Sequence, residues 1–118
     1  VPALLLQGLP DRITAVSVKP AETVDSVELS FKAPGLNGGK GRVSRYELRY
    51  IDSVIEKQDD FEFANEFDCK LTPAAAGTHE TIVLTGLEAG KTWWAGLRAV
   101  DQNGRSGPWS DIIKFTTP

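Results

Sequence analysis

Apolar and polar side chains alternate along much of this chain, with the two-residue period of a half-buried β-strand. In residues 26–32 the apolar positions are Val27, Leu29 and Phe31, separated by polar residues. Residues 93–100 alternate in the same way, but small side chains interrupt both faces. Because small side chains allow close packing, we expect 93–100 to be a crowded central strand and not an edge strand.

Seven segments carry this strand pattern or are rich in β-branched and aromatic residues. They are residues 13–18, 26–32, 43–51, 67–71, 80–84, 93–100 and 112–117. Turn-forming residues separate them, among them Asn103-Gly104. Short strands at this spacing predict an all-β fold of two packed antiparallel sheets. The side chains that we expect to be almost completely buried are Tyr46, Leu48, Leu87, Trp93 and Leu97.

Residues 52–67 interrupt the strand pattern. Phe61, Ala64 and Phe67 recur at three-residue intervals, which is the spacing of one helical face. The segment is acidic, with Lys57 as its one cation against Asp52, Glu56, Asp59, Asp60, Glu62 and Glu66. We expect a helical turn between the strands 43–51 and 67–71, docked onto the fold by Phe61.

Residues 86–101 carry a resemblance to a known family. Their pattern is Gly-Leu-x-x-Gly-x-Thr-Trp-Trp-x-x-Leu-x-Ala-Val-Asp, and it resembles the corner and following strand of a fibronectin type III domain. The spacing Tyr46-x-Leu48-x-Tyr50 and the final Thr-Thr-Pro are similar to that family too. The resemblance covers residues 10–118 and leaves 1–9 as a linker or N-terminal extension. It implies a seven-stranded antiparallel immunoglobulin-like sandwich, with the helical turn between the strands called C and C′.

Two aromatic positions depart from the family pattern. Phe31 stands where a tryptophan is common, and Trp93 stands where a tyrosine is common. The family's tyrosine hydroxyl bonds to backbone near the corner before this strand, whereas an indole has one donor and no acceptor. Either the Trp93 N–H replaces that hydroxyl, or packing alone holds the corner.

Composition and charge exclude some classes of function. The net charge is −3 with no basic stripe, which argues against nucleic-acid binding. No apolar run reaches the roughly 18 residues of a membrane-spanning helix, so we expect no membrane insertion. The 118 residues include no Met, which suggests a segment of a longer or processed chain.

No arrangement in the sequence predicts catalysis strongly. Cys69 is the single cysteine, and we interpret it as a half-buried structural thiol. His79 as a base for Cys69 or a serine is a weak hypothesis, because no nucleophile motif accompanies it. The glycine-rich segment 36–41 is read as a loop, since no Gly-Lys-Ser/Thr opens a helix after it. The carboxylates of 52–68 are interpreted as a solvated face and not as a glycosidase pair.

Calcium is the metal that the sequence could accommodate. Asp101-x-Asn103-Gly104 begins like a loop of oxygen ligands, but Arg105 occupies a position that needs an oxygen, which favours a turn. The run Asp59-Asp60-x-Glu62 is a slightly better candidate. We predict no metal and no cofactor, and leave calcium binding by residues 52–68 open.

The candidate interaction face is aromatic and basic. Its residues are Arg45, Arg49, Trp94, Arg98 and Trp109. Gly-Pro-Trp-Ser around Trp109 resembles half of the tryptophan–serine box of cytokine receptors, in which indoles stack between arginines. Our hypothesis is an internally satisfied cation–π stack, with Glu47 and an indole between the guanidiniums. The alternative is an open patch for a protein or glycan.

The resemblance implies a non-catalytic structural or interaction module of a secreted or cell-surface multidomain protein. Such a module spaces or orients neighbouring domains of the same chain, or binds a protein partner. The alternative is a carbohydrate-contacting accessory module of a secreted enzyme, which would use Trp94 and Trp109. The acidic pattern Asp-Phe-x-x-Ala-x-x-Phe is similar to an insertion in modules of secreted bacterial enzymes and of calcium-activated chloride channel regulators.

Overall fold

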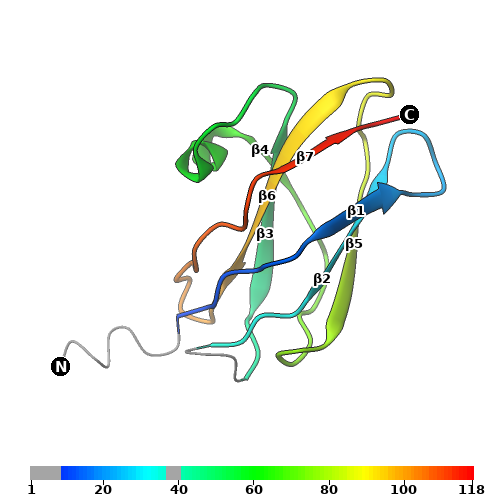
Figure 1. The fold of residues 1–118 in the computed structure, drawn as a ribbon. Coiled ribbons are helices and arrows are strands. Elements are labelled where there is room, and N and C mark those ends of the chain that lie inside the picture. Colours follow the sequence, from blue (N-terminus) through cyan, green and yellow to red (C-terminus); the bar gives the residue numbers. More distant parts are fainter. Residues whose placement is uncertain (1–8, 37–40) are drawn as a thin grey trace.

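The computed structural model describes residues 9–36 and 41–118, and these fold into seven strands and one short 3-10 helix. The elements are β1 (Ser17–Pro20), β2 (Val27–Lys32), β3 (Arg45–Ile51), the 3-10 helix (Gln58–Phe63), β4 (Asn65–Phe67), β5 (His79–Leu84), β6 (Thr92–Val100) and β7 (Ile113–Thr116). One sheet has the order β1-β2-β5 and the other β4-β3-β6-β7, with antiparallel pairs throughout. The sheets face each other as a sandwich, which confirms the predicted fold class (Figure 1).

The main core lies between the two sheets. Leu48 of β3 pairs with Leu97 of β6, and neither side chain is exposed. Val27, Leu29 and Phe31 of β2 meet them from the opposite sheet, as the alternation predicted. All five side chains expected to be almost completely buried are buried, with Trp93 the most exposed at 7%.

We expect Leu97→Ala to lower the free energy of unfolding by about 2–5 kcal/mol. Leu97 is completely buried in the central strand of the larger sheet, so its loss leaves a cavity that rigid neighbours on both sheets cannot fill. Denaturant melts measure the effect. A loss below about 1 kcal/mol would contradict this packing of β6.

The predicted first strand, 13–18, is wrong in its position. Strand β1 begins at Ser17, because Ala15 has a φ of 54°, in the left-handed region that extended chain does not use. The residues before it leave the edge of β2 and line a groove beside Ser110 to Ile113, with Ile13 buried in the core. The apolar side chains there reflect this inward path and not a regular strand.

The predicted strand 67–71 is also displaced. Strand β4 pairs with β3 only over Asn65–Phe67. The chain then turns, because the Asp68 carboxylate accepts the Lys70 backbone N–H and Lys70 has a φ of 50°. Phe67 packs against the main core, so the prediction that it shares a helical face with Phe61 and Ala64 is wrong.

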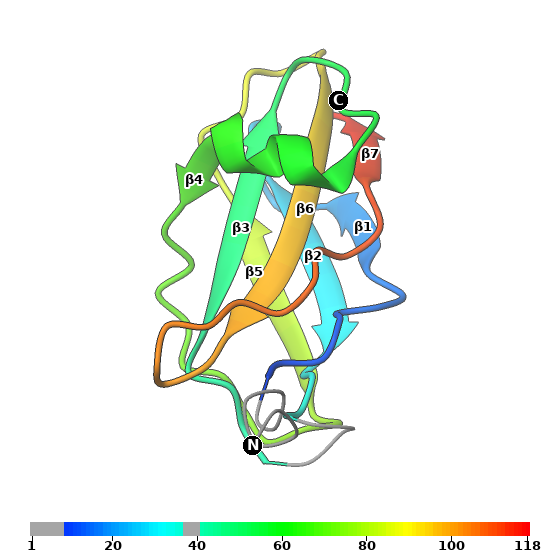
Figure 2. The ribbon, with the colours of Figure 1, turned by 90° about the vertical axis from the view of Figure 1, so that its left-hand side faces the viewer.

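The expected helical turn is present as the 3-10 helix. It lies across β3 and β6 on the face that points away from the other sheet (Figure 2). Residues three apart eclipse one another in such a helix, which places Phe61 and Ala64 together on the sheet side. Phe61 is completely buried, so it docks the segment as expected.

The described chain runs from one end of the sandwich to the other. Pro10 forms a bridge with Leu36 near one end, and Pro118 lies at the opposite end (Figures 1 and 2). The expected extension 1–9, apart from Leu9, and residues 37–40 of the glycine-rich segment lie outside the described residues. Within the described ranges, the structure contains no helix that is long and apolar enough to span a membrane.

Candidate functional site

The candidate interaction face is built around Arg98, at the middle of β6. Its guanidinium carbon lies 4.1 Å from the centroid of the Trp109 ring. Its Nε donates to Glu47 at 2.9 Å, and its Nη1 donates to Glu62 at 2.7 Å. The cation is therefore neutralised by two carboxylates and covered by an aromatic ring, all from this chain.

Glu47 joins the two central arginines. It lies directly opposite Arg98 in the β3–β6 register, and its second oxygen accepts Arg49 Nε at 2.8 Å. The side chain is 5% exposed. Burial alone would raise the pKa of Glu47, but hydrogen bonds from Arg98 and Arg49, with their positive charges, hold the pKa below its ordinary value of 4.5. Glu47 thus separates two like charges that the sheet brings close together.

The outward layer over this sheet is a second cluster of buried side chains, the outer cluster. It consists of Ile55, Phe61, Ala64 and Trp109, with Ile51, Trp94 and Ile112 packed against it. The Phe61 and Trp109 ring centroids are 5.4 Å apart, and Trp109 is 5% exposed. Arg98 and Phe61 therefore cover the indole, which leaves little ring surface for a ligand.

Gly96 makes room for the outer cluster. A Cβ at this position would lie 2.4 Å from Phe61 Cε2, so no side chain larger than hydrogen fits beneath the ring. Gly96 pairs with Arg49 across the sheet, and Arg49 Nη1 donates to the Ala64 carbonyl at 3.0 Å. The 3-10 helix thus packs into the space above Gly96, the Gly96 notch, and the hydrogen bond from Arg49 of β3 holds the residue after the helix in place.

The face predicted from the sequence comes together only in part. Arg49, Arg98 and Trp109 meet through Glu47 and the outer cluster, but Trp109 lies against Arg98 and not between the two guanidiniums. Trp94 is partly exposed at the margin, with Lys114 Nζ 5.7 Å from its ring centroid. Arg45 is exposed and lines a separate groove. Whether these residues bind anything stays a prediction.

Two members of this arrangement were not predicted from the sequence as parts of the face. Glu62 was assigned to a solvated acidic surface, yet it pairs with Arg98. Gly96 is one of the small residues that interrupt the faces of 93–100, and no other role was predicted for it from the sequence. A glycine inside a strand often marks a close approach of another group, which is the signal that could have identified the notch.

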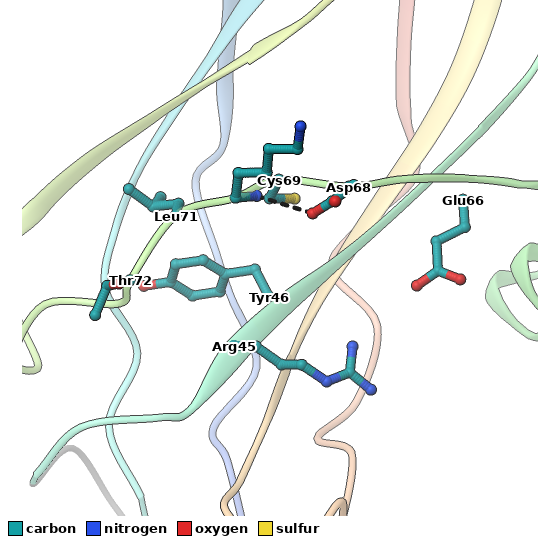
Figure 3. A pocket seen from close by; sticks show the side chains of 8 residues that line it. Arg45, Tyr46, Glu66, Asp68, Cys69, Leu71 and Thr72 are labelled. Carbon is teal, nitrogen blue, oxygen red and sulfur yellow. Dashed lines mark hydrogen bonds between the residues drawn. The ribbon is translucent and has the colours of Figure 1, made fainter.

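The groove beside Cys69 has a volume of about 450 Å3 and is lined by residues of β3, by Glu66 of β4 and by the chain after β4 (Figure 3). Burial, and then the charges of Asp68 and Glu66, raise the pKa of Cys69 to about 11. The thiol is protonated at neutral pH and is a poor nucleophile. His79 is exposed on β5 and lines a different groove, so the structure does not bring the two together.

The Asp101 loop is organised as a turn. The Asp101 carboxylate accepts the backbone N–H groups of Asn103 and Arg105 and the Arg105 Nε, at 2.8–2.9 Å. Its oxygens are therefore engaged by donors of this chain. Across residues 9–36 and 41–118, no group of three or more His, Cys, Asp or Glu side chains is arranged to hold a metal ion.

The corner between β5 and β6 shows how Trp93 replaces the family's tyrosine. Trp93 Nε1 donates to the Glu88 carbonyl at 3.4 Å, and Thr117 Oγ1 donates to the same oxygen at 2.7 Å. The Lys91 N–H in turn donates to Thr117 Oγ1. The Trp93 N–H therefore replaces the tyrosine hydroxyl as a donor, which is one of the two arrangements expected from the sequence. The Thr117 hydroxyl makes the shorter bond to the same carbonyl.

We expect Glu47→Gln to flatten the acid side of the stability curve. A carboxyl group whose pKa is lowered by folding stabilises the fold above its unfolded-state pKa, and this contribution is lost as the pH falls through the folded-state pKa. The loss for Glu47 therefore lies below about pH 4.5, its ordinary pKa. Denaturant melts at a series of acidic pH values measure how steeply the free energy of unfolding falls with pH. Equal slopes for the wild type and Glu47→Gln would contradict the pairing of Glu47 with Arg49 and Arg98.

Comparisons with known proteins agree with this architecture. The sequence matches the family model of the fibronectin type III domain over residues 11–116. No curated protein matches it significantly. The sixth fibronectin type III domain of human fibronectin type III domain containing protein 3 has 19% identity and a TM-score of 0.58, over 92% of this chain and 86% of that chain. A structure described as a myokine has 16% identity and a TM-score of 0.59, over 92% and 98%.

The twitchin kinase region from C. elegans has 20% identity and a TM-score of 0.60. That match covers 93% of this chain but 17% of the twitchin chain, so the likeness is to one part of a larger protein. At these identities the solved structures show a shared fold. The family match, which spans most of the sequence, and the observed sandwich establish that this chain belongs to the fibronectin type III domain family.

Proposed function

We propose that this domain is a non-catalytic module that spaces or orients neighbouring domains, or binds a protein partner, in a secreted or cell-surface multidomain protein. Fibronectin type III domains are commonly structural or interaction modules of multidomain proteins. The observation that carries the proposal is the outer cluster, which covers Trp109 with residues of this chain. The centre of the candidate interaction face, Arg98 with Trp109, is therefore used for packing within the domain.

The exit of the chain supports a role in orienting a following domain. The Gly90 N–H donates to the Pro118 carbonyl at 3.0 Å, and the Thr117 N–H donates to the Lys91 carbonyl at 2.9 Å. Thr117 Oγ1 also donates to Glu88, and Thr117 is 2% exposed. Hydrogen bonds to the last two residues fix the direction in which the chain leaves the sandwich.

The chemistry of the described residues supports the non-catalytic part of the proposal. Cys69 has a raised pKa, and it lines a groove without His79. The carboxylates closest to the arginines, Glu47 and Glu62, are held in ion pairs.

The carbohydrate-contacting alternative needs an aromatic ring that a sugar can stack on. Trp109 is covered, which supports the spacer function over this alternative. Trp94 is the partly exposed indole of the face. A glycan array tests whether Trp94 binds a sugar, and we expect that no glycan on the array retains the protein. Retention that Trp94→Ala abolishes would favour the accessory-module function.

Pulsed electron spin resonance tests the orienting role. One nitroxide is attached at Thr81→Cys on the exposed side of β5 in a Cys69→Ser background, and the second lies in a folded reporter domain fused directly after Pro118. We expect a narrow distance distribution, because the corner holds the exit. Thr117→Val removes the hydroxyl bonds and should broaden it. A wild-type distribution as broad as that of a control with a Gly/Ser spacer after Pro118 would overturn the proposal.

A further inference from the structure

The outward side of the 3-10 helix presents an exposed aromatic ring. Residues three apart eclipse in this helix, so Asp60 and Phe63 share one face, which is a different face from that of Phe61. Phe63 is 87% exposed, whereas Phe61, two residues earlier, is completely buried. Phe63 is the most exposed large apolar side chain among the described residues.

The backbone that carries Phe63 is firmly held. Phe61 sits in the Gly96 notch, and Arg98 Nη1 and Nη2 donate to the two Glu62 oxygens at 2.7 and 3.4 Å. Arg49 fastens the Ala64 carbonyl just after the helix. A ring presented on a fixed backbone loses little conformational freedom when it binds, which is the property of an aromatic interface anchor.

The charges around Phe63 are negative and only partly compensated. Glu62 and Glu66 pair with arginines of the sheet. Glu56 and Asp60 are exposed and make no ion pair among the described residues, and Lys57 is the one cation of residues 52–67. Asp59 instead lines a groove with Arg12 and Arg98. A partner for this surface therefore gains from positive charge, which also steers its approach.

We propose that Phe63 with Asp60 forms a docking surface for a basic protein segment that packs a large apolar side chain against the ring. The proposal deepens the partner-binding form of the proposed function and rests on it. A second copy of this chain is a poorer occupant, because symmetric docking would bring the same carboxylates against each other. An anionic membrane surface is repelled for the same reason.

The test is selection from a random phage-displayed peptide library on the wild-type chain. We expect enriched peptides to carry net positive charge and at least one large apolar residue, and to bind less tightly as salt is added. Phe63→Ser should weaken their binding about tenfold or more, as expected for loss of an aromatic anchor. Val24→Ser is the matched control, since Val24 is 63% exposed in a different turn. Nuclear magnetic resonance shifts should map the bound peptide to residues 57–66.

Phe63→Ser should melt like wild type, because the ring makes few contacts in the folded chain. Enriched peptides that bind Phe63→Ser as well as wild type, or that are acidic, would overturn the proposal. Self-association that Phe63→Ser abolishes in sedimentation would also overturn it and would make a second copy the occupant. The spin-label experiment does not involve Phe63, so the spacer form of the proposed function can stand if this surface fails.

Discussion

Phe61→Ala is expected to lower the free energy of unfolding by about 3–5 kcal/mol, the cost of deleting a completely buried aromatic ring. The ring fills the notch above Gly96 and supports Trp109, and an alanine leaves both surfaces uncovered. The main core between the sheets does not include Phe61. We therefore expect the sandwich to remain folded while residues 55–66 loosen.

Amide hydrogen exchange distinguishes the local effect from the global one. Protection of residues 55–66 should fall in Phe61→Ala, while β2, β5 and β6 stay protected. Phe63→Ala is the matched control, since it removes the same ring from an exposed position two residues away. Unchanged protection over 55–66 would show that Phe61 does not dock the segment. Global unfolding would show that the segment belongs to the main core.

Trp109→Ala is expected to have an effect of similar size, about 3–5 kcal/mol. The indole supplies apolar cover for Phe61 and a cation–π contact for Arg98. Its position is fixed by the next residue, because the Ser110 N–H donates to the Leu97 carbonyl and Ser110 Oγ accepts the Leu97 N–H. The ring therefore loses its side-chain freedom on folding and not on binding.

Denaturant melts of Trp109→Ala measure the loss, and Trp94→Ala is the control because its ring is partly exposed. We expect a lower melting temperature and a clearly smaller effect for Trp94→Ala. Unchanged stability, with loss of binding to a glycan or protein partner, would mean that the stack is a binding site. The accessory-module function would then replace the spacer function.

The alternation of side chains was enough to predict the layers of this fold. Residues 26–32 place Val27, Leu29 and Phe31 in the main core, and residues 93–100 place Trp93 and Leu97 there, as the two-residue period requires. The first strand was predicted to begin too early, because Ile13 and Val16 are apolar for a reason other than strand formation. The chain bends at Ala15 and carries them inward, and no local pattern marks a positive φ at an alanine.

The outer cluster was only partly predictable. The three-residue spacing of Phe61 and Ala64 indicated a docked helical turn, and the structure contains one. The packing of the Phe61 ring on Gly96 was not predicted, because the two residues meet only when β3 and β6 pair in the observed register. Arg98 and Glu62 are far apart in sequence, so their pairing depends on that same register.

A double-mutant cycle between Gly96 and Phe61 tests most directly whether residues 55–64 close the outward face of the β4-β3-β6-β7 sheet. Free energies of unfolding are measured for the wild type, Gly96→Ala, Phe61→Ala and the double variant. In the wild-type background, Gly96→Ala places a methyl group against the Phe61 ring and should cost about 1–3 kcal/mol, as overpacking does. In the Phe61→Ala background the same methyl group enters vacated space, so its cost should vanish. Equal costs in both backgrounds would contradict the contact, and with it the closed face.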